Sequence, residues 1–146
     1  MRFFKPTDAF WQWADGSLGR AVIELGCGRG HLLRELREKG KGVIGIDPYP
    51  LMFGWDIPFD LISCYLAGTA FDFENLITPE FDVLVCRPCH DGFVADFLDA
   101  AFPSILYYVG LEKNIERDLY EHLPRVEMVA SDVGEDGECI WKIAPA

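Results

Sequence analysis

The sequence lacks any long apolar run. No stretch approaches the roughly 18 consecutive apolar residues that a membrane-spanning helix needs. Residues 1–6 also lack the apolar segment of a secretory signal peptide, and no repeat or low-complexity stretch interrupts the chain. These absences argue against membrane-spanning, secreted and disordered classes. They predict a cytoplasmic location and no contact with a membrane.

Positive charge is scarce. The chain has 13 Lys plus Arg against 24 Asp plus Glu, which gives a formal net charge of −11 at pH 7. Such a surface repels a phosphate backbone, so nucleic-acid binding without a partner is not expected. Five basic residues nevertheless cluster in one part of the sequence: Arg29, Arg34, Arg37, Lys39 and Lys41. The sequence leaves open whether they form a basic patch.

Cysteine occurs five times, an odd number that predicts reduced thiols in a chain without an export signal. The five are Cys27, Cys64, Cys86, Cys89 and Cys139. Cys86 and Cys89, with His90, are only three neighbouring metal ligands, and no second C-x-x-C pair accompanies them. We therefore expect no metal site.

Apolar and aromatic residues, by contrast, are plentiful. Half of the 146 residues are hydrophobic, and 11 Phe, 5 Tyr and 4 Trp are spread along the chain. This length and composition predict one domain over residues 1–146 with a full core. Residues 1–19 are expected to form an N-terminal cap segment, with a helix over 7–15 that begins at Thr7.

Residues 21–31 combine a buried strand with closely spaced glycines. Val22, Ile23 and Leu25 predict the strand, and residues 31–39 predict a helix directly after the turn. The intervening glycines, Gly26, Gly28 and Gly30, allow positive φ and a close approach of a ligand. A dinucleotide fingerprint would need its third glycine at position 31, where this chain has His31.

The segment Glu24-x-Gly26-x-Gly28-x-Gly30 resembles the first motif of class I S-adenosylmethionine-dependent methyltransferases. The resemblance implies that Glu24 helps hold the amino group of the cofactor's methionine part. It also implies that the glycines pass under the sulfonium and the ribose. The alternative is a glycine-rich turn that binds no ligand.

A second acid follows the next predicted strand, over residues 42–47. Asp47 lies about 20 residues after the glycines, where a carboxylate can accept hydrogen bonds from both ribose hydroxyls. In the resembled family the same acid holds the ribose. An acid at a strand end also commonly caps a helix, so that interpretation remains.

Two segments depart from the family pattern. Residues 48–60 contain three prolines and predict an irregular, packed loop where most methyltransferases have a helix. After a third strand, expected over 61–66, Thr69 stands where the family usually has an acid that holds adenine. The resemblance then leaves Ala70 and Phe71 to edge the adenine, with Asp72 as a shifted candidate acid.

The remaining chain continues as alternating strands and helices. Strands are predicted over 81–86 and 104–109, helices over 92–102 and 114–123, and an antiparallel hairpin over 126–131 and 139–143. This order, together with the resemblance, predicts an α/β fold. We expect a doubly wound, mostly parallel seven-stranded sheet with a C-terminal antiparallel hairpin.

The segment after the fourth strand, residues 86–91, admits five interpretations. The covalent haem, thioredoxin-type redox and zinc alternatives each fit the Cys86 and Cys89 spacing but lack supporting features elsewhere. The fourth is catalytic, with His90 or Asp91 as a general base or Cys89 as a nucleophile whose pKa Arg87 lowers. The fifth, which we favour, is a pocket wall without chemistry of its own.

The sequence as a whole predicts an S-adenosylmethionine-dependent methyltransferase that acts on a small-molecule or protein nucleophile. The alternative is a catalytically inactive methyltransferase-like scaffold, present as a homodimer or as a partner subunit. The candidate catalytic residues are His90, Asp91 and Cys89. The candidate cofactor-binding residues are Glu24, Gly26, Cys27, Gly28, Gly30, Asp47, Pro48, Ala70, Phe71 and Arg87.

Overall fold

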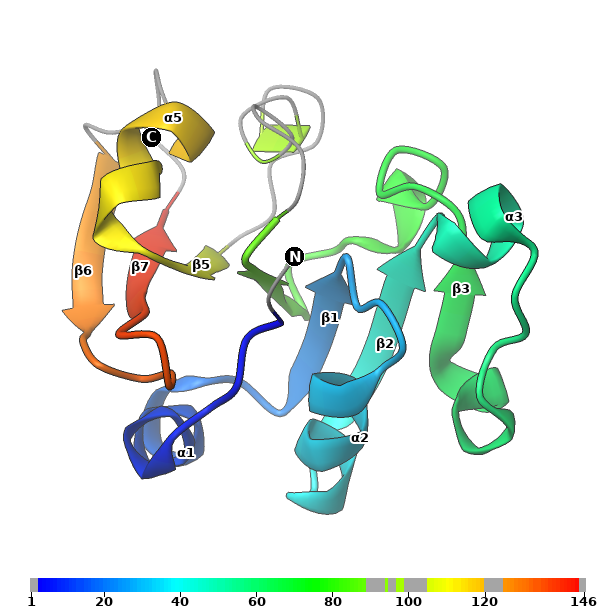
Figure 1. Cartoon of the computed structure of the whole chain (residues 1–146), viewed down its shortest axis with the longest axis horizontal. Helices are drawn as coiled ribbons and strands as arrows, with labels where there is room; N and C mark the ends of the chain where they lie inside the picture. Colours follow the sequence, from blue (N-terminus) through cyan, green and yellow to red (C-terminus); the bar gives the residue numbers. More distant parts are fainter. Residues whose placement is uncertain (1–2, 89–93, 95–96, 99–104, 120–124, 145–146) are drawn as a thin grey trace.

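A seven-stranded sheet organises the computed structural model, which describes residues 3–88, 94, 97–98, 105–119 and 125–144. The strand order is β3-β2-β1-β4-β5-β7-β6 (Figure 1). Strands β1 to β5 pair in parallel, and β7 runs antiparallel to both β5 and β6. The strands are β1 (Ala21–Leu25), β2 (Gly42–Asp47), β3 (Tyr65–Ala67), β4 (Asp82–Cys86), β5 (Ile105–Gly110), β6 (Val126–Ala130) and β7 (Cys139–Ile143). The predicted fold class, including the terminal hairpin, is confirmed.

Short helices connect these strands. The α-helices are α1 (Asp8–Ser17), α2 (His31–Glu38), α3 (Tyr49–Phe53) and α5 (Ile115–Leu119), and the 3-10 helices are η1 (Phe59–Cys64), η2 (Glu74–Leu76) and η3 (Glu112–Asn114). Most of the helix predicted over 92–102 lies outside the described residues, as does the end of the one predicted over 114–123. Of the former, Val94, Phe97 and Leu98 are described and are buried.

The prediction of an irregular loop over residues 48–60 is wrong for its first part, where α3 forms. Pro48 and Pro50 fall at the start of this helix, where a missing backbone N–H costs nothing. The Asp47 carboxylate accepts a hydrogen bond from the Tyr49 N–H, and Gly54 ends the helix with a φ of 66°. The prolines that predicted irregularity therefore begin a helix.

The strand predicted over 61–66 is also largely replaced, because η1 continues to Cys64 and β3 starts only at Tyr65. Arg34 and Arg37 of α2 hold Asp60, with the Arg34 Nε 2.6 Å from its carboxylate. The neighbouring Leu61 is fully buried. These contacts fold the chain down toward α2, so only a three-residue strand remains at the sheet edge.

Helix α1 covers a face of the sheet. Phe10 and Ala14 are buried in the same core cluster as the apolar side of α2, and Trp13 contacts Tyr107 of β5 with ring centroids 4.8 Å apart. Strand β5 is internal to the sheet. The helix predicted over residues 7–15 therefore lies neither over the pocket described below nor at a sheet edge. The Thr7 hydroxyl donates to the Asp132 carbonyl and does not cap the helix.

Candidate active site

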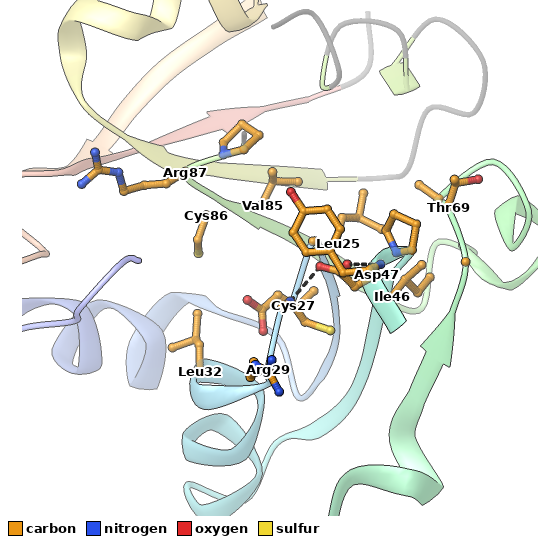
Figure 2. A pocket seen from close by; sticks show the side chains of 18 of the residues that line it. Leu25, Cys27, Arg29, Leu32, Ile46, Asp47, Thr69, Val85, Cys86 and Arg87 are labelled. Carbon is orange, nitrogen blue, oxygen red and sulfur yellow. Dashed lines mark hydrogen bonds between the residues drawn. The ribbon is translucent and has the colours of Figure 1, made fainter. Parts of the chain in front are cut away.

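A pocket of about 540 Å³ opens at the carboxyl ends of β1, β2 and β4, where open α/β sheets bind their ligands. Along it, Arg87, Cys86 and Leu32 lie at one end and Thr69 at the other, with Asp47 and Cys27 between them (Figure 2). Nine of the ten candidate cofactor residues line this pocket, and the exception is Gly30. Residues from five separate segments of the sequence are thus brought to one cavity.

The glycine turn, residues 26–30, has the backbone that its sequence predicts. Gly26, Gly28 and Gly30 have φ of 73°, 57° and 82°, in the left-handed region that favours glycine. A Cβ on Gly26 would meet no heavy atom within 4 Å, whereas a Cβ on Gly30 would lie 2.2 Å from Leu61 Cδ1. Gly26 therefore leaves its side of the turn open, while Gly30 allows the turn to pack on the core.

Asp47 fastens this turn to β2. The buried carboxylate accepts one hydrogen bond from the Gly28 N–H and another from the Tyr49 N–H, each 2.8 Å long. The helix-capping interpretation of Asp47 is therefore observed. Each carboxylate oxygen can accept a further hydrogen bond, so the ribose role is compatible with these contacts.

Glu24 is the one buried acid of the pocket with an unpaired oxygen among the described residues. Its side chain is only 4% exposed, and Oε1 has no hydrogen-bond partner in the described part of the chain. Burial, and then the charge of Asp47, raise the pKa of this carboxyl to about 8. A buried carboxylate without a partner is costly, which indicates a position built to receive a cation.

The two thiols that line the pocket, Cys27 and Cys86, do not resemble activated nucleophiles. Burial, followed by the charge of Glu24, raises the pKa of both Cys27 and Cys86 well above the usual range for a thiol. A reactive or redox-active cysteine needs a lowered pKa, so Cys86 does not fit the thioredoxin-type interpretation. The candidates Cys89, His90 and Asp91 lie outside the described residues.

Thr69 and Asp72 form a closed turn at the far end of the pocket. The Asp72 carboxylate accepts from the Thr69 N–H at 2.9 Å, and the Asp72 N–H donates back to the Thr69 hydroxyl at 3.3 Å. The Thr69 N–H lowers the pKa of Asp72, which stays ionised. Ala70 is buried and Phe71 is 41% exposed. A planar, apolar group therefore has a partly open surface to contact here.

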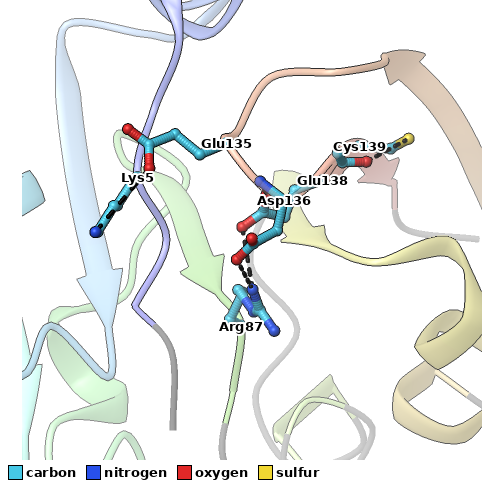
Figure 3. A network of polar contacts seen from close by, with 7 residues as sticks. Lys5, Arg87, Glu135, Asp136, Glu138 and Cys139 are labelled. Carbon is cyan, nitrogen blue, oxygen red and sulfur yellow. Dashed lines mark hydrogen bonds and ion pairs between the residues drawn. The ribbon is translucent and has the colours of Figure 1, made fainter.

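Arg87 lines the pocket, and its guanidinium points away from Asp47 and Cys27 (Figure 2) and toward the connection between β6 and β7 (Figure 3). Its Nη1 lies 2.9 Å from Asp136 and 3.4 Å from Glu138, in the connection between β6 and β7. The predicted direct contact of Arg87 with a cofactor would therefore involve its backbone. The guanidinium is engaged elsewhere.

Sequence reasoning missed several residues of the site. Phe3 and Phe4 line the pocket from the N-terminal segment, and no local pattern marked them. The Tyr65 hydroxyl donates to the Gly28 carbonyl at 2.6 Å and supports the glycine turn from β3. The sequence predicted a strand at Tyr65. The hydrogen bond from its hydroxyl to Gly28 could not be predicted, because it depends on the register in which β3 pairs with β2.

The five basic residues between positions 29 and 41 contact the protein itself. Arg29 lies over the Trp55 ring and Lys39 over the Trp11 ring. Lys41 donates to two carbonyls at the end of α1, and Arg34 and Arg37 hold Asp60 as described above. Each of the five thus has an intramolecular partner, so the cluster serves the fold.

No helix of the described residues is long and apolar enough to cross a membrane. Within the same residues, no group of three or more His, Cys, Asp or Glu side chains could hold a metal ion. Cys27, Cys64, Cys86 and Cys139 are free thiols.

Solved structures that share this fold include methyltransferases with different substrates. The chain superposes on the 23S rRNA methyltransferase ErmE with a TM-score of 0.60 at 19% identity, covering 99% of this chain and 70% of that one. For a chain of the E. cuniculi Mtq2–Trm112 complex the TM-score is 0.58 at 16% identity, with both chains covered completely. For the magnesium protoporphyrin IX methyltransferase of Synechocystis PCC 6803, solved with bound S-adenosylmethionine, it is 0.56 at 15% identity, covering 93% and 75%.

These likenesses support the fold alone, and no curated protein matches the chain. The family follows from a direct match over residues 3–100 to the model of a methyltransferase domain, which covers more than half of the chain. That segment contains the glycine turn, Asp47 and every residue that lines the pocket. The chain therefore belongs to this methyltransferase family.

Proposed function

We propose that this chain binds S-adenosylmethionine in the pocket and transfers its methyl group to a small-molecule or protein nucleophile. The observation that carries the proposal is the unpaired oxygen of buried Glu24 beside the glycine turn. A bound ammonium group would give this oxygen its missing partner and lower the pKa of the carboxyl. The methionine part of the cofactor carries such a group.

The other lining residues fit the rest of the cofactor. Asp47, in the middle of the pocket, would accept hydrogen bonds from the ribose, and Ala70 with Phe71 would contact the adenine. Gly26 and Gly28 leave the backbone accessible. The bound cofactor supplies an electrophilic methyl on a sulfonium, so the protein mainly positions and desolvates the two reactants.

A small-molecule or protein acceptor is favoured over nucleic acid. The net charge of −11 repels phosphate, and the basic cluster that could have offset it is held by intramolecular contacts. We place the reaction in the cytoplasm, where the four described thiols would remain reduced.

Calorimetry with S-adenosylmethionine and S-adenosylhomocysteine tests the proposal. We expect saturable binding of both, and a large loss of affinity in Asp47→Ala because the variant lacks the ribose acceptor and the Gly28 contact. Absence of binding at millimolar ligand would contradict the proposal. So would an affinity that Asp47→Ala leaves unchanged.

A second candidate is a partner-dependent or catalytically inactive subunit. Five large apolar side chains are more than half exposed on α3 and η1, at the β3 end of the sheet: Leu51, Met52, Phe53, Phe59 and Ile62. The related Mtq2 fold is found in a complex with Trm112. Bound cofactor that is never consumed, together with a dimer in light scattering that Phe59→Ser dissociates, would favour this candidate.

A further inference from the structure

The 132–138 connection between β6 and β7 contacts two walls of the pocket at once. On one side it meets the N-terminal segment that carries Phe3 and Phe4, and on the other it meets Arg87, directly after β4 (Figure 3). The connection itself does not line the pocket. It therefore acts on the pocket only through these two segments.

Backbone hydrogen bonds attach the N-terminal segment. The Thr7 N–H donates to the Val133 carbonyl at 2.8 Å, and the Glu135 N–H donates to the Lys5 carbonyl at 3.0 Å. Pro6 also forms a β-bridge with Gly134. Phe4 is thus held next to the connection, and a Cβ on Gly134 would lie 2.8 Å from the Phe4 ring.

Glu138 links this contact to Arg87. Its side chain is fully buried, and Oε1 accepts from the Asp136 N–H at 3.0 Å while Oε2 faces the Arg87 guanidinium at 3.4 Å. The same carboxylate lies 2.3 Å from where a Cβ on Gly134 would be. Arg87, Glu138, Gly134 and Phe4 therefore form one continuous packed chain of contacts.

Arg87 has a further reason to need this support. Its φ of 46° is in the left-handed region, which is unfavourable for a residue with a side chain. The Arg87 N–H still donates to the Val109 carbonyl of β5. The ion pairs with Asp136 and Glu138 therefore help to fix the direction in which the chain leaves β4.

We propose that Arg87 and Glu138 are positioning residues, whose ion pair makes the N-terminal wall and the wall after β4 move as one unit. We call this end of the pocket, where Phe4, Cys86, Arg87 and Pro88 lie, the acceptor end. The proposal rests on the proposed function in one respect. The acceptor end faces away from Thr69 and the adenine, so it is where the methyl acceptor would enter.

Two measurements on Arg87→Ala test the coupling. First, hydrogen exchange at the Thr7 and Glu135 amides should become about tenfold faster, although neither residue touches Arg87. Second, alkylation of Cys86 should accelerate about tenfold, while alkylation of Cys27 in the glycine turn changes less than twofold. A nearby cation favours the reactive thiolate, so its loss alone would not speed the alkylation of Cys86. Faster alkylation therefore indicates that the pocket wall has opened.

Arg87→Lys keeps the charge and should restore most of the wild-type behaviour. Glu138→Gln is a milder change and should accelerate exchange and Cys86 alkylation less than Arg87→Ala does. It replaces Arg87→Ala in the test if that variant does not fold. Unchanged exchange at Thr7 and Glu135 would overturn the proposal. Equal acceleration at Cys27 and Cys86 would also overturn it, because that pattern indicates general unfolding.

Calorimetry with S-adenosylhomocysteine on the same variants separates this proposal from the proposed function. We expect the dissociation constant of Glu138→Gln to stay within twofold of wild type, because Glu138 does not line the pocket. A large loss of affinity with unchanged exchange would overturn the positioning role. Failure of the wild type to bind would contradict the proposed function and leave the exchange and alkylation tests valid.

Discussion

Two parts of the pocket, the glycine turn and the acceptor end, are held by contacts of different range. Around the glycine turn, Asp47 bonds to Gly28 across 19 residues and to Tyr49 across 2. At the acceptor end, Arg87 meets Asp136 and Glu138 across 49 and 51 residues. The glycine turn is held from the neighbouring strands β2 and β3, with Tyr65 37 residues from Gly28, whereas the acceptor end depends on the connection between β6 and β7. The cofactor half should therefore tolerate changes in the C-terminal strands better than the acceptor end does.

The largest expected effect is on Glu24. Glu24→Gln removes the negative charge that would meet the cofactor ammonium while keeping the shape of the side chain. Loss of one partner of a buried charge pair costs about 3 kcal/mol, so affinity for S-adenosylmethionine should fall more than 100-fold. Titration calorimetry measures this affinity. An affinity within threefold of wild type would show that Glu24 does not bind the cofactor. The contrast between the glycine turn and the acceptor end would then fail.

Gly30→Ala tests the packing under the glycine turn. The new Cβ would lie 2.2 Å from Leu61 Cδ1 and would also adopt an unfavourable positive φ. We expect a loss of about 3 kcal/mol in the free energy of unfolding, from strain and overpacking together. The matched control is Gly40→Ala, which has a φ of 89° and open space around its Cβ. It should cost only about 1 kcal/mol. Equal losses of unfolding free energy in the two variants, measured by urea denaturation, would show that Leu61 moves aside without cost.

Gly134→Ala tests the acceptor end in the same way. Its Cβ would collide with the Glu138 carboxylate and the Phe4 ring, without any positive φ to add strain. We expect a loss of about 2 kcal/mol together with faster exchange at the Thr7 amide. Gly16→Ala, inside α1 with nothing within 4 Å, should instead stabilise by up to about 1 kcal/mol. A Gly134→Ala protein as stable as wild type would mean that the connection is loosely packed.

Tyr65→Phe should have the smallest effect. It removes one hydrogen bond to the Gly28 carbonyl and leaves the ring in place, so we expect a loss of about 1 kcal/mol. Thermal unfolding followed by circular dichroism would detect it. No change in stability would show that water replaces the hydroxyl at this carbonyl and that β3 contributes little to the turn.

The same difference in range explains what the sequence predicted well. The positions of β1 and β2, the positive φ of Gly26, Gly28 and Gly30, and the gathering of Glu24 and Asp47 all follow from local patterns. Backbone conformation and short spacing determine them. The alternation of strands and helices with a final hairpin likewise determined the fold class.

Contacts between distant segments were not predictable. The direction of the Arg87 side chain depends on acids some 50 residues later, and the N-terminal segment that brings Phe3 and Phe4 to the pocket pairs with the 132–138 connection. The prolines of residues 48–60 predicted a loop because their place at the start of α3 depends on the Asp47 cap. The shortened β3 depends on the Arg34 and Arg37 contacts with Asp60.

The most direct test of the account is the proton balance of cofactor binding near pH 7. Without ligand, a pKa of about 8 keeps Glu24 mostly protonated at this pH, and because this pKa is raised from 4.5, the stability of the fold falls as pH rises from about 4.5 to about 8. An arriving ammonium requires the ionised carboxylate, so binding should release a proton and strengthen as pH rises from 6 to 7.5. Calorimetry of S-adenosylmethionine binding in two buffers of different ionisation enthalpy measures this release.

The account predicts that the wild type releases about one proton more per bound cofactor than Glu24→Gln does at pH 7. The remaining affinity of Glu24→Gln should depend much less on pH over the same interval. Equal proton release by the two proteins, with affinities that follow pH in parallel, would contradict the assignment of Glu24 as the partner of the cofactor's amino group.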